Sequence, residues 1–318
     1  MKRIITALLF FATAKISLGA QQTIQPDELV RPADTDDKIV TFDNPHGVYF
    51  PEGTSRGELL LFLPGTNKKE NQMPGARRFC RNAATSGYNV IFLMYPNDVA
   101  AAEACREDAD PNAFSDFRKT LIEGGDTRHL KLARSESIEN RAIKLLLFLA
   151  HEHPDQGWQS FITKDQLEWT KIAVAGQSQG GGHAAWIATR HLVARVLCFG
   201  SPKDYSLKLN APAKWYGDSV TPLERYFAFN NIYDKQGCDY EQLVKNFGAL
   251  GLDKLGVVDV GRDSPPYHHA HVLFTNWPGH IIDSKEAHGS VIRDSLLDSR
   301  GIPIFRPVWH YMLTAPTT

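Results

Sequence analysis

A serine with a glycine two residues away on either side is the first pattern in this chain that could do chemistry. The segment reads Gly176-Gln177-Ser178-Gln179-Gly180. A short apolar run before it predicts a buried parallel strand, and the Ala-rich stretch after it predicts a helix. A serine at such a turn is exposed at its tip, and the glycines remove Cβ atoms that would collide where strand and helix cross. We therefore interpret Ser178 as a nucleophile beside the N–H groups of a helix N-terminus.

A serine hydroxyl is a weak nucleophile until an imidazole accepts its proton, and that imidazole needs a carboxylate to fix its tautomer. Downstream of Ser178, Asp234 directly follows one predicted strand and His288 lies one loop beyond the last one. Serine, then acid, then histidine is the chain order expected when each follows the carboxyl end of a strand in a parallel sheet. We expect Ser178, Asp234 and His288 to form a catalytic triad.

Two rival residues stay open on the sequence alone. Asp204 follows the strand before the one that leads to Asp234, and His280 lies in the same loop as His288. Asp234 is favoured by its chain position. His288 is favoured because it stands just before a predicted helix and is followed by Gly289, which leaves room for the imidazole.

An oxyanion site needs a second donor besides the serine turn. The apolar run at residues 59–63 predicts a strand covered on both faces, and it ends in Pro64-Gly65-Thr66. A glycine at this point lets backbone N–H groups approach a ligand. The N–H of Thr66 is the candidate donor, with Gly65 shaping the turn; the alternative is an ordinary strand-ending turn.

Alternating strand and helix patterns indicate a single α/β domain over residues 21–318. Strands are predicted at 39–42, 48–50, 58–63, 88–95, 172–175, 196–200, 226–231 and 271–275. Helices are predicted at 74–86, 135–149, 183–190, 240–250 and 291–297. Ser135 or Ser137 is suited to cap the second of these helices. This order is typical of a mostly parallel sheet with helices on both faces.

The sequence also predicts where two further segments lie in the fold. Residues 98–134 are acidic and poor in large apolar side chains, so we expect a loop or cap excursion over the carboxyl edge of the sheet, where substrate contacts are common. Residues 299–318 are rich in proline and aromatic side chains, and we expect them to pack back onto the body.

The first twenty residues have the pattern of a secretory signal peptide. Lys2 and Arg3 precede an apolar stretch at 4–12, and small residues around Gly19 offer a cleavage point. The apolar stretch is too short for a stable transmembrane span. We exclude residues 1–20 from the fold and expect a secreted or periplasmic protein; the alternative is an uncleaved anchor or a buried helix.

Charge and cysteine content say little about partners. The formal net charge is −1, which gives no electrostatic argument for nucleic acid or a membrane surface. An even number of cysteines permits two disulfides in an exported chain, with the pairing undetermined. Cys198 stands in an apolar run that also suits a buried free thiol. The four cysteines are Cys80, Cys105, Cys198 and Cys238.

The histidines at 268, 269 and 271 invite a metal interpretation. His269 and His271 would share one face of a strand, but no carboxylate or cysteine partner is apparent in the sequence. A solvated cluster is favoured over a zinc site. We expect neither a metal nor a cofactor.

From about residue 58 to 297 the chain resembles the α/β-hydrolase superfamily. The resemblance is carried by the Pro64-Gly65-Thr66 turn, the 176–180 turn and the ordered acid and histidine. It implies an eight-stranded, mostly parallel sheet and oxyanion donors at Thr66 and Gln179. Pro64 is a departure, since many members carry a histidine there, and it bears on the exact position of the second oxyanion donor. Residues 176–182 and the following helix are also similar to a branch of poorly characterised exported bacterial hydrolases.

The function expected from these patterns is that of an exported serine esterase, lipase-like in class. It would cleave a small-molecule or polymer ester through an acyl-enzyme, without nucleic acid as partner and without stable membrane insertion. The sequence leaves the oligomeric state open. A peptidase or amidase with the same triad is one alternative, and a non-catalytic binding module on this fold is another.

Overall fold

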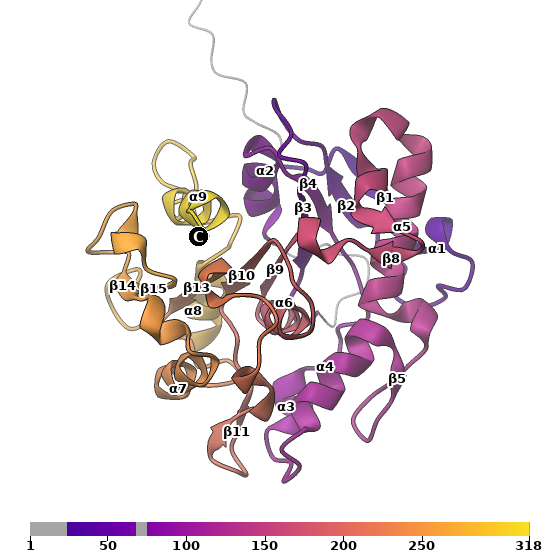
Figure 1. Cartoon of the computed structure of the whole chain (residues 1–318). Helices are drawn as coiled ribbons and strands as arrows, with labels where there is room; N and C mark the ends of the chain where they lie inside the picture. The colour runs from indigo at the N-terminus through magenta and orange to yellow at the C-terminus, as the bar shows by residue number, and fades with distance from the viewer. Residues whose placement is uncertain (1–23, 68–74, 318) are drawn as a thin grey trace, which may run out of the picture.

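The computed structural model describes residues 24–67 and 75–317, which form a central sheet with helices on both faces (Figure 1). The predicted signal peptide at 1–20 lies outside these residues, so the division into a leader and one domain stays a prediction. None of the helices in the described ranges is both long and apolar enough to cross a membrane.

The central sheet has nine strands within the described residues, in the order β1-β2-β4-β3-β9-β10-β13-β15-β14. The strands are β1 (Glu28–Val30), β2 (His46–Tyr49), β3 (Leu59–Leu63), β4 (Asn89–Phe92), β9 (Ile172–Gln177), β10 (Arg195–Phe199), β13 (Tyr226–Asn231), β14 (Val257–Asp259) and β15 (Val272–Thr275). β2 pairs antiparallel with both of its neighbours, and all other neighbouring pairs are parallel. The predicted mostly parallel α/β sheet is confirmed, with nine strands in place of the eight implied by the resemblance.

Helices are present in the four regions predicted at 74–86, 135–149, 183–190 and 240–250, and the structure adds helices that the sequence analysis did not predict. They are α1 (Pro32–Thr35), α2 (Arg77–Thr85), α3 (Ala101–Cys105), α4 (Ala113–Glu123), α5 (Ile138–Glu152), α6 (Gln179–Arg190), α7 (Tyr240–Leu250), α8 (Ser284–Ser290) and α9 (Arg306–Thr314). The cap of α5 is Ser137, whose hydroxyl accepts a hydrogen bond from the N–H of Asn140 at 3.2 Å. α9 packs against α2, as expected for a C-terminal segment that returns to the body.

Strand β3 shows how the sheet separates two apolar cores. Leu59, Leu61 and Leu63 join the core that contains residues of α4, α5 and α6. Leu60 and Phe62 join the core on the other face, which contains residues of α2 and α9. Successive side chains of a strand point to opposite faces, so a strand covered on both sides is a continuous apolar run.

The strand predicted at 39–42 is wrong. The N–H groups of Val40 and Thr41 donate to one carboxylate oxygen of Glu136, at 2.8 and 3.0 Å. The guanidinium of Arg141 donates to the carbonyl oxygens of Thr41 and Phe42. Side chains therefore satisfy the backbone groups that a strand would have paired. The edges of the sheet are instead β1 and β14, three residues each, which the sequence analysis missed.

The helix predicted at 291–297 is also wrong. The helix in this region is α8, which starts earlier because Asp283 caps it by accepting from the N–H groups of Lys285 and Glu286. The carbonyl of Val291 accepts from the indole N–H of Trp309 at 2.9 Å. His288 therefore lies in the last turn of α8 and not just before a helix.

The excursion at 98–134 contains α3, α4 and a short hairpin, β5 (Gly125–Asp126) with β6 (Lys131–Leu132). α4 packs against α5 and α6, and α3 packs against α4. These helices lie beside α6 in Figure 1. The excursion thus lies next to the helix that follows the candidate nucleophile.

Candidate functional site

Ser178 stands alone between the end of β9 and the start of α6. Its backbone has φ 56° and ψ −121°, a conformation that costs a non-glycine residue energy and that is held only when the surroundings enforce it. The N–H of Ser178 donates to the carbonyl of Phe199 on β10 at 2.8 Å, which fixes the turn against the neighbouring strand. This is the strained strand-to-helix turn that the Gly-x-Ser-x-Gly pattern predicts.

The glycines around Ser178 are required by close backbone contacts. A Cβ on Gly176 would overlap with the backbone of Gly180, and a Cβ on Gly180 would overlap with the carbonyl of Leu63 on β3. Two more glycines serve the helix itself, because a Cβ on Gly181 would strike the Ser201 hydroxyl, and one on Gly182 would strike a buried guanidinium. That guanidinium belongs to Arg118 of α4.

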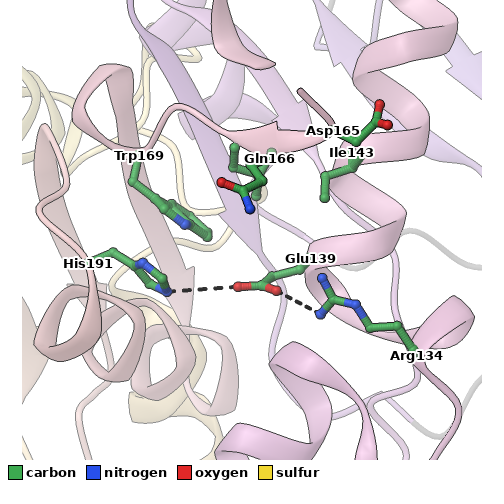
Figure 2. A pocket seen from close by; sticks show the side chains of 8 residues that line it. Arg134, Glu139, Ile143, Asp165, Gln166, Trp169 and His191 are labelled. Atoms are coloured by element: carbon green, nitrogen blue, oxygen red, sulfur yellow. Dashed lines mark hydrogen bonds and ion pairs between the residues drawn. The ribbon is translucent and has the colours of Figure 1, made fainter. Parts of the chain in front are cut away.

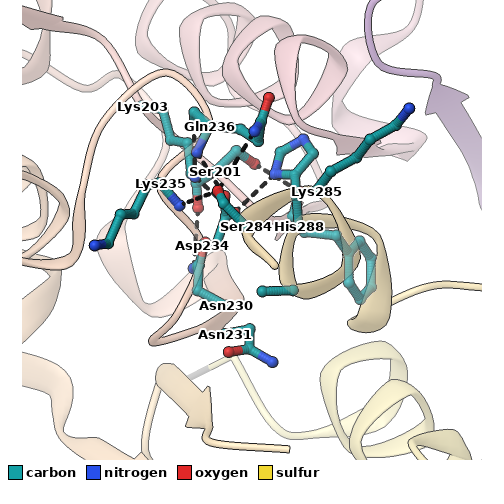
Figure 3. A network of polar contacts seen from close by, with 12 residues as sticks. Ser201, Lys203, Asn230, Asn231, Asp234, Lys235, Gln236, Ser284, Lys285 and His288 are labelled. Atoms are coloured by element: carbon teal, nitrogen blue, oxygen red, sulfur yellow. Dashed lines mark hydrogen bonds and ion pairs between the residues drawn. The ribbon is translucent and has the colours of Figure 1, made fainter. Parts of the chain in front are cut away.

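His288 and Asp234 are hydrogen-bonded. The Nδ1 atom of His288 lies 2.7 Å from Oδ2 of Asp234, which is 2% exposed (Figure 3). The Nε2 atom of His288 makes no hydrogen bond within the described part of the chain. The imidazole lies against Gly200, after β10, where a Cβ would come within 3.3 Å of the ring.

A lysine contacts the same carboxylate. The Nζ atom of Lys203 lies 2.6 Å from Oδ2 of Asp234 and donates to the carbonyl of Gln236 at 2.8 Å. The other oxygen, Oδ1, accepts from the N–H of Gln236 at 2.8 Å. Burial would raise the pKa of Asp234, but the hydrogen bond from His288, its charge and the Lys203 ammonium outweigh that, so the pKa lies below its usual value. Asp234 is therefore a carboxylate that accepts from three directions.

Neither rival residue belongs to the His288–Asp234 pair, although Asp204 lines the same cavity. Asp204 forms a two-pronged ion pair with Arg118, with both N–O distances at 2.5 Å, and also accepts from the indole of Trp215 at 2.9 Å. Its contacts include no histidine. His280 is exposed and does not line the cavity that contains Ser178. The structure thus brings His288 together with Asp234 and leaves Asp204 and His280 apart from them.

The loop after β3 lies against the serine turn. A Cβ on Gly65 would lie 3.0 Å from the Cβ of Ser178. Asn97 donates to the carbonyl of Gly65 at 2.8 Å, and the hydroxyl of Tyr95 donates to the carbonyl of Pro64 at 2.7 Å. The N–H of Thr66 donates to none of the described residues. It is held beside Ser178 with its donor unused.

Gln179 offers the other candidate donor. As the first residue of α6, it has no partner within the helix for its N–H. Its side chain is occupied elsewhere: Oε1 accepts from the N–H of Ala101 at 2.7 Å, and Nε2 donates to the carbonyl of Val99 at 2.9 Å. The side chain therefore ties the excursion to the serine turn.

One cavity of about 490 Å³ collects the predicted residues. Ser178, His288, Thr66 and Gln179 all line it. The excursion supplies part of its wall through Ala100, Ala101, Ala102, Glu103, Arg106 and Arg118. The carboxyl ends of β3, β9, β10 and β13 and the loops after them supply further lining residues, and α8 supplies Lys285 and His288.

A second pocket, of about 290 Å³, lies at the other end of β9 (Figure 2). Trp169, just before that strand, stacks on His191 with ring centroids 4.9 Å apart. Glu139 pairs with Arg134 at 2.7 Å and lies 3.8 Å from His191. This pocket contains none of the predicted site residues.

Sequence reasoning missed two charged residues of the site. Lys203 is a lysine two residues beyond a strand-ending Gly-Ser pair, and Arg118 stands in a segment treated as a loop. Neither position carries a motif, because a contact with a distant carboxylate leaves no spacing signal. Only the pairing of β10 with β13 puts Lys203 near Asp234.

Cysteines and histidines add no second reactive group. All four cysteines are buried and free, so neither of the permitted disulfides is present. Burial raises the pKa of Cys198 to about 12. In the described ranges, no three histidine, cysteine or acidic side chains are placed to hold a metal. His268 contacts Asp263, and His271 stacks on Phe227.

Comparison with known proteins gives likenesses in structure only. No family model and no curated protein matches the sequence. Among solved structures, a propionate-bound esterase of the Planctomycetes species Thermogutta terrifontis is 13% identical, with 79% of this chain and 83% of that chain covered and a TM-score of 0.41. An α/β serine hydrolase homologue from Coxiella burnetii is 11% identical, with 73% and 81% covered and a TM-score of 0.39.

A third structure is an acetyl ester-xyloside bifunctional hydrolase from Caldicellulosiruptor lactoaceticus, 8% identical, with 83% of this chain and 93% of that chain covered and a TM-score of 0.41. At these identities and TM-scores, the likenesses decide neither the fold nor the chemistry of this chain.

Proposed function

We propose that this chain is an exported serine hydrolase of the α/β-hydrolase type, and that it cleaves carboxylic esters. Ser178 is the nucleophile, His288 the base and Asp234 the acid. The N–H groups of Gln179 and Thr66 form the oxyanion hole. The observation that carries the proposal is the 2.7 Å contact between His288 and Asp234, in a histidine that shares one cavity with the strained Ser178.

The acylation step follows from these positions. With Nδ1 of His288 bonded to Asp234, the nitrogen left to accept a proton is Nε2. Ser178 Oγ attacks the ester carbonyl carbon as its proton passes to Nε2, and the carbonyl oxygen becomes an oxyanion between the two N–H groups. The bond to the alcohol oxygen then breaks as the imidazolium gives its proton to that oxygen. An alcohol leaves, and an acyl group remains on Ser178.

Deacylation repeats the step with water in place of the serine. Water attacks the acyl carbon while Nε2 of His288 takes one of its protons, and the tetrahedral intermediate collapses with that proton returned to Ser178 Oγ. The net reaction is ester plus water to carboxylic acid plus alcohol. Asp234 stays ionised throughout and stabilises the imidazolium in both steps, in keeping with the lowered pKa of its carboxyl.

A fluorophosphonate probe tests the nucleophile, because it phosphonylates only an activated serine. We expect one label, on Ser178, and no label in Ser178→Ala. Ser160→Ala is the matched control, since Ser160 is exposed and lies outside the cavity. Labelling of Ser178→Ala at the wild-type rate would refute the assignment, and an unlabelled wild-type chain would favour a non-catalytic binding module.

A matched ester and amide test the bond type. We expect 4-nitrophenyl acetate to be hydrolysed and 4-nitroacetanilide to be left intact, both measured by release of the nitroaromatic product. Ser178-dependent cleavage of the anilide at a comparable kcat/KM would instead assign the chain to the amidases or peptidases.

Export belongs to the same proposal, as does placement in the branch of exported bacterial hydrolases. The support is the charged, apolar and small-residue order of residues 1–20 and the similarity of residues 176–182. We expect the mature protein in the periplasm or medium, with an intact mass that lacks the first twenty residues. A full-length chain retained in the cell would contradict export and leave the triad untouched.

A further inference from the structure

We infer that the substrate of this site is a polar ester that carries a negative charge, such as a carboxylate, next to the scissile bond. The inference rests on the proposed ester hydrolysis and names its substrate class. Three observations on the 490 Å³ cavity carry it: the number of basic side chains in its wall, the lack of carboxylate partners for two of them, and the lack of large apolar side chains among the described residues that line it.

The cavity wall is rich in basic side chains. Among the residues that the structure describes, five of them line it, against two acidic side chains, Glu103 and Asp204. They come from separate parts of the chain: the excursion, the loops after β10 and β13, and the first turn of α8. The five are Arg106, Arg118, Lys203, Lys235 and Lys285. This excess contrasts with the net charge of −1 for the whole chain, so it is local to the cavity.

The two buried cations are already neutralised. Arg118 is bound to Asp204 at 2.5 Å, and Lys203 to Asp234 at 2.6 Å. A buried charge is tolerated only with such a partner. These two side chains are therefore structural, and they leave the cavity no net charge of their own.

Lys235 and Lys285 are different. Both are exposed, and neither makes an ion pair within the described residues. Figure 3 shows them on either side of the Asp234–His288 pair, with their ammonium groups turned away from it. They flank the histidine without contacting its carboxylate, so their charge is available to a ligand at the mouth of the cavity.

The cavity wall lacks large apolar side chains. Its described lining consists of charged side chains, glutamines, a serine, a threonine, a histidine, three alanines and a glycine, so its hydrocarbon comes from the stems of polar side chains and from the alanines. No valine, leucine, isoleucine, methionine, phenylalanine, tyrosine or tryptophan of the described residues lines it. Sites for apolar ligands are built mainly from such side chains, so a long acyl group would find no cluster of them here.

Apolar side chains do gather in a smaller neighbouring pocket of about 210 Å³, lined by Phe62, Pro64 and Ile292 among others. Neither Ser178 nor His288 lines that pocket. The larger cavity, which Ser178 and His288 do line, is the one that contains Lys235 and Lys285, and these cations favour an anionic ester at the reacting atoms.

The test compares two esters of nearly the same shape. 4-Acetoxybenzoate carries a carboxylate on its alcohol part, and 4-acetoxybenzamide carries a neutral amide at the same place. Each rate is divided by the rate of alkaline hydrolysis of the same ester, to remove the difference in leaving group. We expect kcat/KM for the anion to exceed that for the amide by about tenfold at low salt, because two unscreened cations act on it, and the ratio to fall as NaCl is added.

Variants that remove the charges of the two exposed lysines test whether these side chains cause the preference for the anionic ester. We expect the ratio of anion to amide to fall about tenfold in Lys235→Gln/Lys285→Gln. Lys164→Gln/Lys254→Gln is the matched control, since it removes the same charge from two exposed lysines that precede β9 and β14 and do not line the cavity. The control is expected to keep the wild-type ratio. Thermal melting and the rate of fluorophosphonate labelling show that each variant is folded.

The outcomes separate this inference from the proposed function. A ratio near one in the wild type, with Ser178-dependent hydrolysis of both esters, overturns the inference and leaves the function standing. The inference is also overturned if Lys235→Gln/Lys285→Gln keeps the wild-type ratio of anion to amide, as its control is expected to do. If neither ester is hydrolysed and Ser178 takes no label, the proposed function fails and the inference fails with it.

Discussion

Asp234 shares a single carboxylate oxygen between two nitrogen atoms. Oδ2 accepts from His288 at 2.7 Å and from Lys203 at 2.6 Å, while Oδ1 is held by the N–H of Gln236. In the proposed triad Lys203 is a positioning residue, because its ammonium contacts the carboxylate of Asp234 that orients His288. The two partners fix the carboxylate in the orientation that keeps Nδ1 of His288 protonated.

The choice between the two aspartates can be measured directly. Asp234→Asn should lower kcat for 4-nitrophenyl acetate by on the order of 10³- to 10⁴-fold, because the asparagine no longer stabilises the imidazolium. Asp204→Asn removes a charge that belongs to the Arg118 pair, and should mainly lower stability. Both variants are assayed below their melting temperatures. An equal loss of kcat in Asp204→Asn would return Asp204 to the triad.

Lys203→Met should reduce the free energy of unfolding by about 2 kcal/mol at pH 7, because it removes one of the two side-chain partners of the buried Asp234 carboxylate. The effect depends on pH with a definite sign. The folded pKa of Asp234 lies below its ordinary value of 3.8, so the stabilisation is present above that value and is lost as the pH falls through the folded pKa. Urea unfolding at pH 7, 5 and 3.5 should show a difference between wild type and variant that shrinks toward acid. A difference that grows instead would contradict this role.

At the scale of elements, the strand-turn-helix unit around Ser178 was predictable because its constraint is local. Gly176 and Gly180 are needed by backbone contacts within the turn and with β3, and such contacts leave a fixed spacing in the sequence. Apolar runs such as β3 were equally clear, since burial on both faces leaves no polar position. The strand predicted at 39–42 failed because Glu136 and Arg141, about a hundred residues away, satisfy its backbone.

The wrong helix prediction near His288 also results from a contact between residues that are distant in the sequence. Apolar side chains at 291–297 suggested a helix, but the indole N–H of Trp309 donates a hydrogen bond to the carbonyl of Val291. The cap at Asp283 was the local signal for the helix that does form. Contacts that join residues far apart in the sequence, such as Lys203 with Asp234, have no local signal, so this part of the site could not be predicted.

Gly180→Ala tests the crossing of α6 over β3. The added Cβ would overlap with the carbonyl of Leu63, so the helix start must shift, at a cost of about 1–3 kcal/mol. We expect a lower melting temperature and slower fluorophosphonate labelling of Ser178, because the displaced helix carries the N–H of Gln179. Gly217→Ala is the control, since a Cβ there has nothing within 4 Å. Similar melting temperatures and labelling rates for the two variants would refute the packing argument.

At the scale of the molecule, the residues of the proposed active site lie at one edge of the sheet, and an apolar core packs against each face of the sheet. Loops after β3, β9, β10 and β13 meet at the cavity. Buried polar groups are the points where this construction is sensitive to solution conditions. His46 and His183 are fully buried, and the Nε2 atom of each lacks a hydrogen-bond partner.

Burial, with the charge of Arg141 near His46 and of Arg118 near His183, lowers the pKa of both histidines well below 6.5. In the unfolded chain they take up protons as the pH falls below about 6.5, while in the folded chain they stay neutral, so stability falls toward acid. Each contributes about 1.4 kcal/mol per pH unit below that point. We expect the slope of unfolding free energy between pH 6 and 5, measured in urea, to decrease in His183→Gln. An unchanged slope would show that His183 is protonated when folded.

The ion pair of Arg118 with Asp204 also bears on how the sequence of this chain can change. Lys203 and Asp204 are adjacent, yet one is bound to Asp234 and the other to Arg118 of the excursion. If Asp234 is the catalytic acid, as proposed, a lineage that moved this role to position 204 would first have to release that carboxylate from the guanidinium beside Gly182. Losing Arg118 alone would leave a buried carboxylate without its ion-pair partner, which is strongly destabilising. We therefore expect that no single substitution transfers the role of the acid to Asp204 without a loss of stability.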